Sequence, residues 1–155
     1  GIEYFVAPGV SSLKSYIKEL FGTRNILVHN TFTGLADIEE ARKKGVFWCF
    51  CPGANLYIEG QLPDLTLFSD LSGQICIGTD SLASNAQLSV LAELNLVGRN
   101  APFFSEEELL AMICRNGARA LGIEDRFGSL LPGHAPGLNL LRSTGTGFEL
   151  IKKIF

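Results

Sequence analysis

Two short apolar segments of the chain end close to side chains that can do chemistry. His29 directly follows the apolar segment 25–28, and Asp80 lies just beyond the apolar segment 75–77. Taken singly, the histidine is explained as a buried core residue and the aspartate as a cap for the loop that follows it. An imidazole and a carboxylate that lie together can bind a metal ion or move a proton from water. The pair therefore indicates a site that neither residue indicates alone.

Small polar residues surround Asp80 in the sequence GTDSLASN. Ser81, Ser84 and Asn85 leave space beside the carboxylate and offer hydrogen bonds, so we interpret them as candidate substrate-binding residues. The same segment has neither the glycine spacing nor the lysine of a phosphate-binding loop, and the chain contains no Gly-x-Ser-x-Gly nucleophile motif. Glu93, further along, is compatible with a place in the site or at the surface.

The four cysteines lie in or beside apolar segments, where a free thiol behaves as a small apolar side chain. They are Cys49, Cys51, Cys76 and Cys114. The spacing of Cys49 and Cys51 is one residue shorter than the usual Cys-x-x-Cys metal or redox motif, and in a strand these two thiols share one face. We therefore expect core packing rather than disulfides or metal binding.

Composition narrows the class of protein. With 155 residues, 46% of them hydrophobic, the chain is long enough to bury a core. Its formal net charge is −3 and its basic residues form no stripe, which argues against nucleic acid as a partner. No apolar run approaches the roughly 20 residues of a membrane span. We expect a cytoplasmic protein without nucleic acid or membrane as a partner.

Apolar strands alternate with helical patterns up to about residue 100. Strands are predicted at 25–28, 46–51 and 75–77, and helices at 11–20, 36–44, 63–71, 88–97, 105–115 and 118–121, with a further apolar run at 2–6. This alternation predicts a parallel sheet covered by helices, in which chemistry is found at the carboxyl ends of the strands. His29 and Asp80 are both at that edge.

Local signals set the expected ends of these elements. Ser105 and Glu108 form a capping box at the start of helix 105–115. Gly73 and Gly98 are predicted to end helices, and the sequence Cys51-Pro52-Gly53 is predicted to close the second strand in a turn. The glycine-rich stretch after residue 122 predicts hairpins.

Four segments resemble the amidohydrolase superfamily, in the branch that includes deaminases and triazine chlorohydrolases. ILVHN resembles the sixth barrel strand of that family with its histidine at His29, and CPGANLYIEGQLPDL resembles its strand-seven segment, with Asn55 at the asparagine position. ICIGTDSLASN is similar to the eighth strand with its aspartate at Asp80, and NGARALGIEDRFGSLLPG is similar to the exit from the barrel. Ala54 departs from the usual serine of the strand-seven segment.

The resemblance implies an α/β fold. Residues 1–125 would form the C-terminal part of a (β/α)8 TIM barrel of the metal-dependent hydrolases. Residues 126–155 would add strands of the small accessory β-sandwich domain.

The resemblance also implies a metal-dependent hydrolase that deaminates an amino-substituted heterocycle or a nucleoside-like substrate through a metal-bound hydroxide. Asp80 would be metal ligand and base, His29 would orient the water or stabilise the tetrahedral centre, and Asn55 would join the substrate-binding residues. The cofactor would be one divalent metal ion, zinc in the first instance and iron as the alternative. A non-catalytic scaffold or ligand-binding fragment of a degenerate barrel is the alternative function.

Part of the family's metal site has no counterpart in the chain. The resemblance requires a His-x-His pair on strand one and a histidine on strand five, whereas the chain has two histidines, His29 and His134. The chain also begins at Gly1, and its single methionine is Met112. We therefore expect an N-terminal part of the same polypeptide to complete the site and this chain alone to be inactive. Formation of a homo-oligomer is left open.

Overall fold

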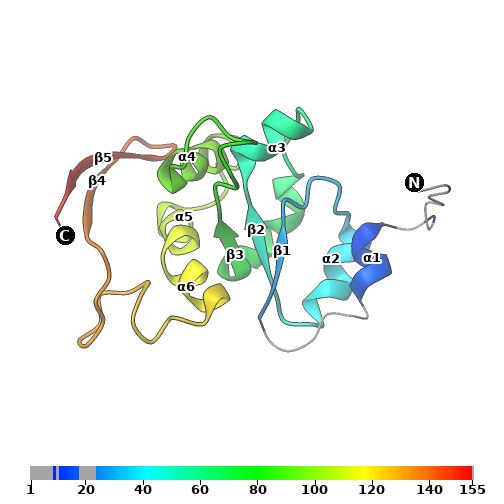
Figure 1. Cartoon of the computed structure of the whole chain (residues 1–155), viewed down its shortest axis with the longest axis horizontal. Coiled ribbons are helices and arrows are strands. Elements are labelled where there is room, and N and C mark those ends of the chain that lie inside the picture. Colours follow the sequence, from blue (N-terminus) through cyan, green and yellow to red (C-terminus); the bar gives the residue numbers. More distant parts are fainter. Residues whose placement is uncertain (1–8, 10, 18–23, 155) are drawn as a thin grey trace.

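Figure 1 shows the computed structural model, which describes residues 9, 11–17 and 24–154 of the chain. The apolar run at 2–6 and the end of the predicted first helix, residues 18–20, lie outside the described residues. Within them, helix α1 (Ser12–Tyr16) is capped by the side chain of Ser11, which accepts a hydrogen bond from the N–H of Lys14. Ser11 also donates to Asp37 and so ties α1 to the next helix.

The centre of the molecule is a parallel sheet of three strands in the order β1-β2-β3. These strands are β1 (Asn25–Val28), β2 (Val46–Phe50) and β3 (Ile75–Ile77). Parallel neighbours need long crossovers. Helix α2 (Leu35–Arg42) makes the first crossover, and helix α3 (Pro52–Ile58) with the 3-10 segment η2 (Leu65–Gln74) makes the second. The parallel sheet predicted from the sequence is confirmed.

One face of the sheet packs on an aromatic core. Trp48 and Phe50 of β2 are buried and contact Phe68 of η2 edge-to-face, with ring centroids 5.1 and 5.0 Å apart. Such pairs add about 0.5–1.5 kcal/mol each beyond the burial of their area. Helices α4 (Val90–Asn100) and α5 (Glu106–Ile113) complete this core with buried residues that include Leu94 and Met112. This packing fixes β2 and β3, and with them the residues that follow their carboxyl ends.

The opposite face of the sheet is covered only in part. Phe47 and Cys76 pack with Ala120 of helix α6 (Arg115–Leu121). By strand register Ile26 and Val28 of β1 lie opposite Phe47 and Cys49 on this face, and both β1 side chains are exposed. An apolar face open at one edge of a sheet is a surface that further structure can cover.

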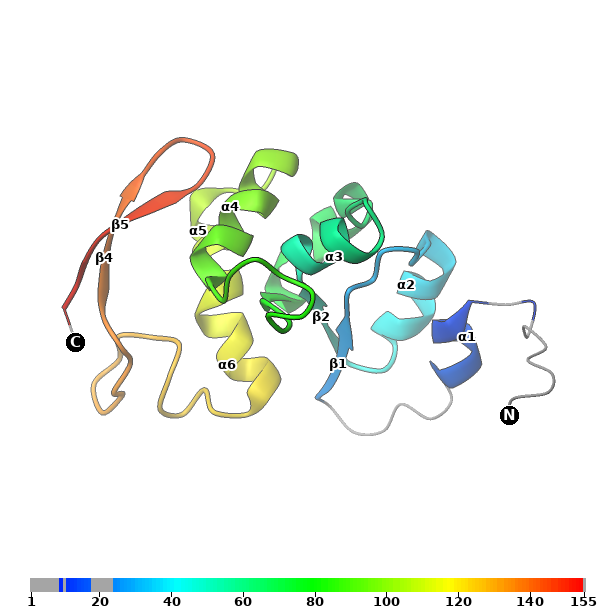
Figure 2. The same cartoon turned by 45° about the horizontal axis from the view of Figure 1, so that its top comes forward.

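A hairpin lies at the end of the molecule farthest from α1 and α2. Strands β4 (Asn139–Ser143) and β5 (Phe148–Lys153) pair antiparallel, as the glycine-rich sequence predicts. Figure 2 shows the hairpin beside α4 and α5. Asn95 of α4 fixes it, because its amide donates to the carbonyl of Phe148 at 2.8 Å and accepts from the N–H of Phe148 at 2.7 Å.

Two of the turns or helix ends predicted from the sequence are wrong. Pro52 and Gly53 begin α3 instead of closing β2 in a turn, because proline lacks an N–H and fits the first position of a helix. Gly98 lies inside α4 rather than at its end. A Cβ there would come within 2.5 Å of the carbonyl oxygen of Thr146, so close approach of the hairpin explains the glycine.

The later segment boundaries differ in similar ways. The predicted helix 63–71 is the 3-10 segment η2, which continues through Gly73. The helices predicted at 105–115 and 118–121 are both present, but the boundary between them lies at Cys114 (φ −117°, ψ −89°), so that α6 starts at Arg115. The capping box of Ser105 and Glu108 is confirmed at the start of α5. No helix in the described ranges is long and apolar enough to cross a membrane.

Candidate active site

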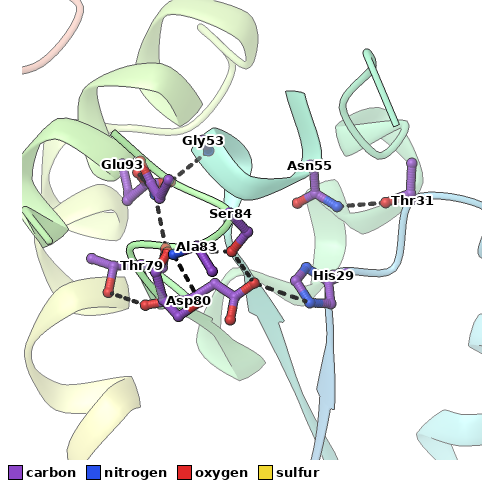
Figure 3. Close-up of polar contacts among 11 residues, drawn as sticks. His29, Thr31, Gly53, Asn55, Thr79, Asp80, Ala83, Ser84 and Glu93 are labelled. Carbon is purple, nitrogen blue, oxygen red and sulfur yellow. Dashed lines mark hydrogen bonds and ion pairs between the residues drawn. The ribbon is translucent and has the colours of Figure 1, made fainter. Parts of the chain in front are cut away.

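His29 and Asp80 lie together at the carboxyl edge of the sheet. They follow β1 and β3, whose backbones are separated by β2 and hence by about 10 Å. Figure 3 shows the two side chains pointing toward each other, with Nε2 of His29 3.9 Å from Oδ2 of Asp80. About a third of each side chain is exposed, 35% for His29 and 33% for Asp80. The structure therefore brings together the two residues that the sequence singled out.

The backbone at both residues has an unusual conformation, which directs their side chains along the carboxyl edge of the sheet. His29, Asn30 and Asp80 all have positive φ, at 70°, 61° and 57°. Residues other than glycine adopt this conformation rarely, with asparagine, aspartate and histidine the most tolerant, and it costs about 1–3 kcal/mol each. Asn30 offsets part of this cost, since its side-chain amide donates to the carbonyl of Leu27 at 2.9 Å. Asn30 was not predicted as a site residue, because its only signal in the sequence is its place directly after His29.

Asp80 is held as an anion. The hydroxyl of Ser84 donates to its Oδ2 at 2.6 Å. This hydrogen bond is the main cause that lowers the pKa of Asp80, followed by the backbone N–H of Ser81 and the nearby His29 imidazole. Ser84 is buried, whereas Ser81 is exposed and its hydroxyl accepts from the N–H of Ala83. Both serines therefore shape the loop of Asp80, and the carboxylate is ionised at neutral pH.

Asn55 contacts the loop of His29. It is fully buried in α3, and its Nδ2 donates to the hydroxyl of Thr31 at 2.5 Å. Its Oδ1 is buried without a hydrogen-bond partner among the described residues, as is Nδ1 of His29. Asn55 thus joins α3 to the segment that leaves β1, two residues after the histidine.

Asn85 and Glu93 stabilise the part of the carboxyl edge that carries Asp80. Nδ2 of Asn85 donates to the carbonyl of Thr79 and to Oε1 of Glu93, both at 2.8 Å. Oε2 of Glu93 accepts from the backbone N–H of Gly53 at 2.7 Å, and the residue is 1% exposed. The sequence left open whether Glu93 lies in the site or at the surface. The structure places it away from the surface, with hydrogen bonds to Gly53 and Asn85 beside the site.

The thiols of Cys49, Cys51 and Cys76 form a cluster below Asp80. Cys51 and Cys76 are buried, and a Cβ at Gly78 would lie 3.1 and 3.2 Å from the sulfurs of Cys49 and Cys51. The contact with Cys51 lowers the pKa of Cys49, but the contact with Cys76 and burial outweigh it and raise this pKa to about 12. All four cysteines are free thiols. The packing expected for Cys49 and Cys51 is confirmed.

Asp80 fits one position of a metal centre. An ionised carboxylate at an open edge is a ligand that zinc accepts, but protein zinc sites take three or four protein ligands. Across residues 9, 11–17 and 24–154 no group of three or more histidine, cysteine, aspartate or glutamate side chains could hold a metal ion. The described residues by themselves therefore do not form a complete zinc centre.

Comparison with known proteins assigns the family. The sequence profile of the Amidohydrolase family matches residues 2–153. The chain belongs to this family. It is 36% identical over 114 residues to a 5-methylthioadenosine/S-adenosylhomocysteine deaminase of Teredinibacter turnerae, a match that covers 68% of this chain and 26% of the relative. The family predicted from the sequence is confirmed.

Solved structures agree with this assignment. An adenosine deaminase from Xanthomonas campestris with bound zinc is 30% identical with a TM-score of 0.65, over 76% of this chain and 29% of that one. A triazine hydrolase from Arthrobacter aurescens is 25% identical with a TM-score of 0.71, over 83% and 30%. The chain thus spans between a quarter and a third of these relatives and matches both deaminases and a triazine hydrolase.

Proposed function

We propose that this chain forms part of a metal-dependent amidohydrolase that hydrolyses a C–N bond, most simply by deaminating an amino-substituted heterocycle or a nucleoside-like substrate. The observation that carries the proposal is the convergence of His29 and Asp80, with Nε2 and Oδ2 3.9 Å apart at the carboxyl edge of a parallel sheet. The family assignment and the deaminases among the relatives support the reaction class.

Strands β1, β2 and β3 are proposed to be barrel strands six, seven and eight. Their consecutive parallel order and the exposed apolar residues Ile26 and Val28 on β1 support this assignment, because a closed barrel would cover that face. Residues 1–125 would then be the barrel part and 126–155 a part of the small β domain. The remaining barrel strands and metal ligands would come from a preceding part of the same polypeptide.

In this mechanism Asp80 has two roles. Its side chain is one ligand of a divalent metal ion, with zinc favoured because zinc is bound in the Xanthomonas relative. Such an ion supplies a water with a pKa near neutrality. Asp80, whose own pKa is lowered by the hydrogen bond from Ser84, is ionised and would accept a proton from a water held at this edge and pass it to the departing amine.

His29 is proposed to stabilise the developing charge. Its Nε2 faces Asp80 at the open edge, so a ring N–H there can donate to a substrate atom bound beside the two side chains. Asn55 holds the loop that follows His29 through Thr31. Ser81, Ser84 and Asn85 line the loop of Asp80, where they limit the size of the group that reaches the carboxylate.

Release of ammonia tests the proposed reaction. The protein, as its open reading frame encodes it, is incubated with adenosine, 5-methylthioadenosine, S-adenosylhomocysteine and an amino-substituted chlorotriazine, and ammonia and chloride are both measured. We expect ammonia from at least one purine nucleoside and loss of that activity in His29→Asn. Chloride release from a chlorotriazine without ammonia release would replace deamination with dechlorination. Tight binding of these compounds without either product would favour the non-catalytic alternative.

A further inference from the structure

Glu93 is a buried carboxylate that no step of the proposed reaction uses. It lies in α4 with 1% of its surface exposed, and both of its oxygens accept hydrogen bonds. Burial of a charge is costly unless the charge is paired or hydrogen-bonded. The two donors, Gly53 and Asn85, belong to separate segments at the carboxyl edge of the sheet. The contacts of Glu93 therefore join parts of the candidate active site.

The first contact fixes the start of α3. Pro52 opens this helix without an N–H of its own, and Cys51, at the N-cap, makes no side-chain hydrogen bond to the helix. Oε2 of Glu93 accepts from the N–H of Gly53 at 2.7 Å and so supplies the missing cap from 40 residues away. A Cβ at Gly53 would lie 2.6 Å from Oε1 of Glu93, so the glycine is needed for this close approach.

The second contact fixes the loop that carries Asp80. Oε1 of Glu93 accepts from Nδ2 of Asn85, and the same Nδ2 donates to the carbonyl of Thr79, each at 2.8 Å. Thr79 directly precedes Asp80, whose backbone has the strained φ of 57°. The carboxylate of Glu93 thus holds the backbone from which the Asp80 side chain projects.

The contacts reach His29 as well. Helix α3, which Glu93 caps, carries Asn55, and Asn55 donates to Thr31 just beyond His29. Figure 3 shows Glu93 beside Gly53 with Asp80 below them, and Asn55 beside Thr31 with His29 below Asn55. We propose that Glu93 is a positioning residue that sets the separation of His29 and Asp80 for catalysis. This inference rests on the proposed function.

Glu93→Gln is the variant that tests it. Glutamine keeps the size of the side chain but offers one oxygen in place of two, so either the N–H of Gly53 or the amide of Asn85 faces another donor. Because misplacement by about 1 Å costs roughly 10²-fold in rate, we expect kcat to fall by about that factor with KM nearly unchanged. The effect should be non-additive with Asn85→Ala in a double-mutant cycle, since both changes break the same chain of contacts.

Asn116→Ala is the matched control. Asn116 is also fully buried and donates two hydrogen bonds, to the carbonyls of Ser72 and Ile75, but it lies at the other end of β3. It should lower stability and leave kcat unchanged. An equal loss of kcat in Asn116→Ala, or additive effects of Glu93→Gln and Asn85→Ala, would overturn the positioning role. If Glu93→Gln does not fold, Asn85→Ala takes its place, and a loss of kcat in Asn116→Ala equal to that in Asn85→Ala would overturn the positioning role.

Amide NMR spectra separate this inference from the proposed function. In Glu93→Gln the resonances of Gly53, Thr79 and Asp80 should shift while that of Trp48, in the centre of β2, stays in place. These shifts are expected whether or not the wild-type protein turns over any substrate. Absence of turnover with the shifts present would remove the proposed function alone. Unchanged resonances at all three positions would overturn the role of Glu93 directly.

Discussion

Replacing Asn116 with alanine should destabilise the protein by about 2–4 kcal/mol. Nδ2 of Asn116 donates to the carbonyls of Ser72 and Ile75 at 2.8 Å each. Each buried carbonyl left without a donor costs about 1–3 kcal/mol. Oδ1 of Asn116 has no hydrogen-bond partner among the described residues, so its removal offsets part of the loss. The balance corresponds to a 30- to 1,000-fold change in the unfolding equilibrium, at about 1.4 kcal/mol for each factor of ten.

Urea unfolding followed by the fluorescence of Trp48, the single tryptophan of the chain, measures this change. With a slope of about 2 kcal/mol per molar urea, the middle of the usual range, the midpoint should fall by roughly 1–2 M. Asn100→Ala is the control, because Asn100 is exposed and also donates to one backbone carbonyl, that of Leu96, at 2.8 Å. The control should stay within about 0.5 kcal/mol of the wild-type protein. A loss below about 1 kcal/mol for Asn116→Ala would refute the reasoning from its two hydrogen bonds.

Three further predictions concern the site and the thiols beneath it. Ser84→Ala removes the main hydrogen bond that lowers the pKa of Asp80, so this pKa should rise and the acid limb of the pH profile of kcat/KM should move to higher pH; an unchanged limb would contradict the assignment of Asp80 as base. His29→Asn should reduce turnover and retain more bound metal than a substitution of Asp80, as metal analysis of both variants checks. Alkylation of Cys49, with a pKa of about 12, should be slow at pH 8 and rise about tenfold per pH unit, which peptide mass spectrometry after iodoacetamide treatment measures; fast labelling at pH 8 would contradict the raised pKa.

The sheet and the meeting of His29 and Asp80 were predictable because both rest on local rules. Short apolar runs alternating with helical patterns predict parallel strands, and the carboxyl ends of parallel strands share one edge. The residues that follow those runs therefore lie on the same edge of the sheet. Only the strained backbone, with φ of 70° at His29 and 57° at Asp80, adds information that no pattern carried.

The elements that the sequence misplaced depend on contacts between distant residues. Gly53 is predicted as a turn residue but lies in α3. The residue is a glycine because Glu93 occupies the space that a side chain would need. Gly98 is predicted to end a helix but lies within α4. The residue is a glycine because Thr146 of the hairpin approaches it closely. In both cases the glycine is required by a residue 40 or more positions away in the sequence. Local sequence patterns do not indicate such contacts.

The most direct test of the proposed reaction is Asp80→Asn, with turnover and metal content measured on the same preparations. Asparagine keeps the size of the side chain and removes both its charge and its capacity to accept a proton. Turnover should fall by more than the 10²- to 10⁴-fold typical of one general base, because metal binding is weakened too. Near-normal turnover and metal content in Asp80→Asn would make this carboxylate a loop cap held by Ser84, and the proposed mechanism would be wrong.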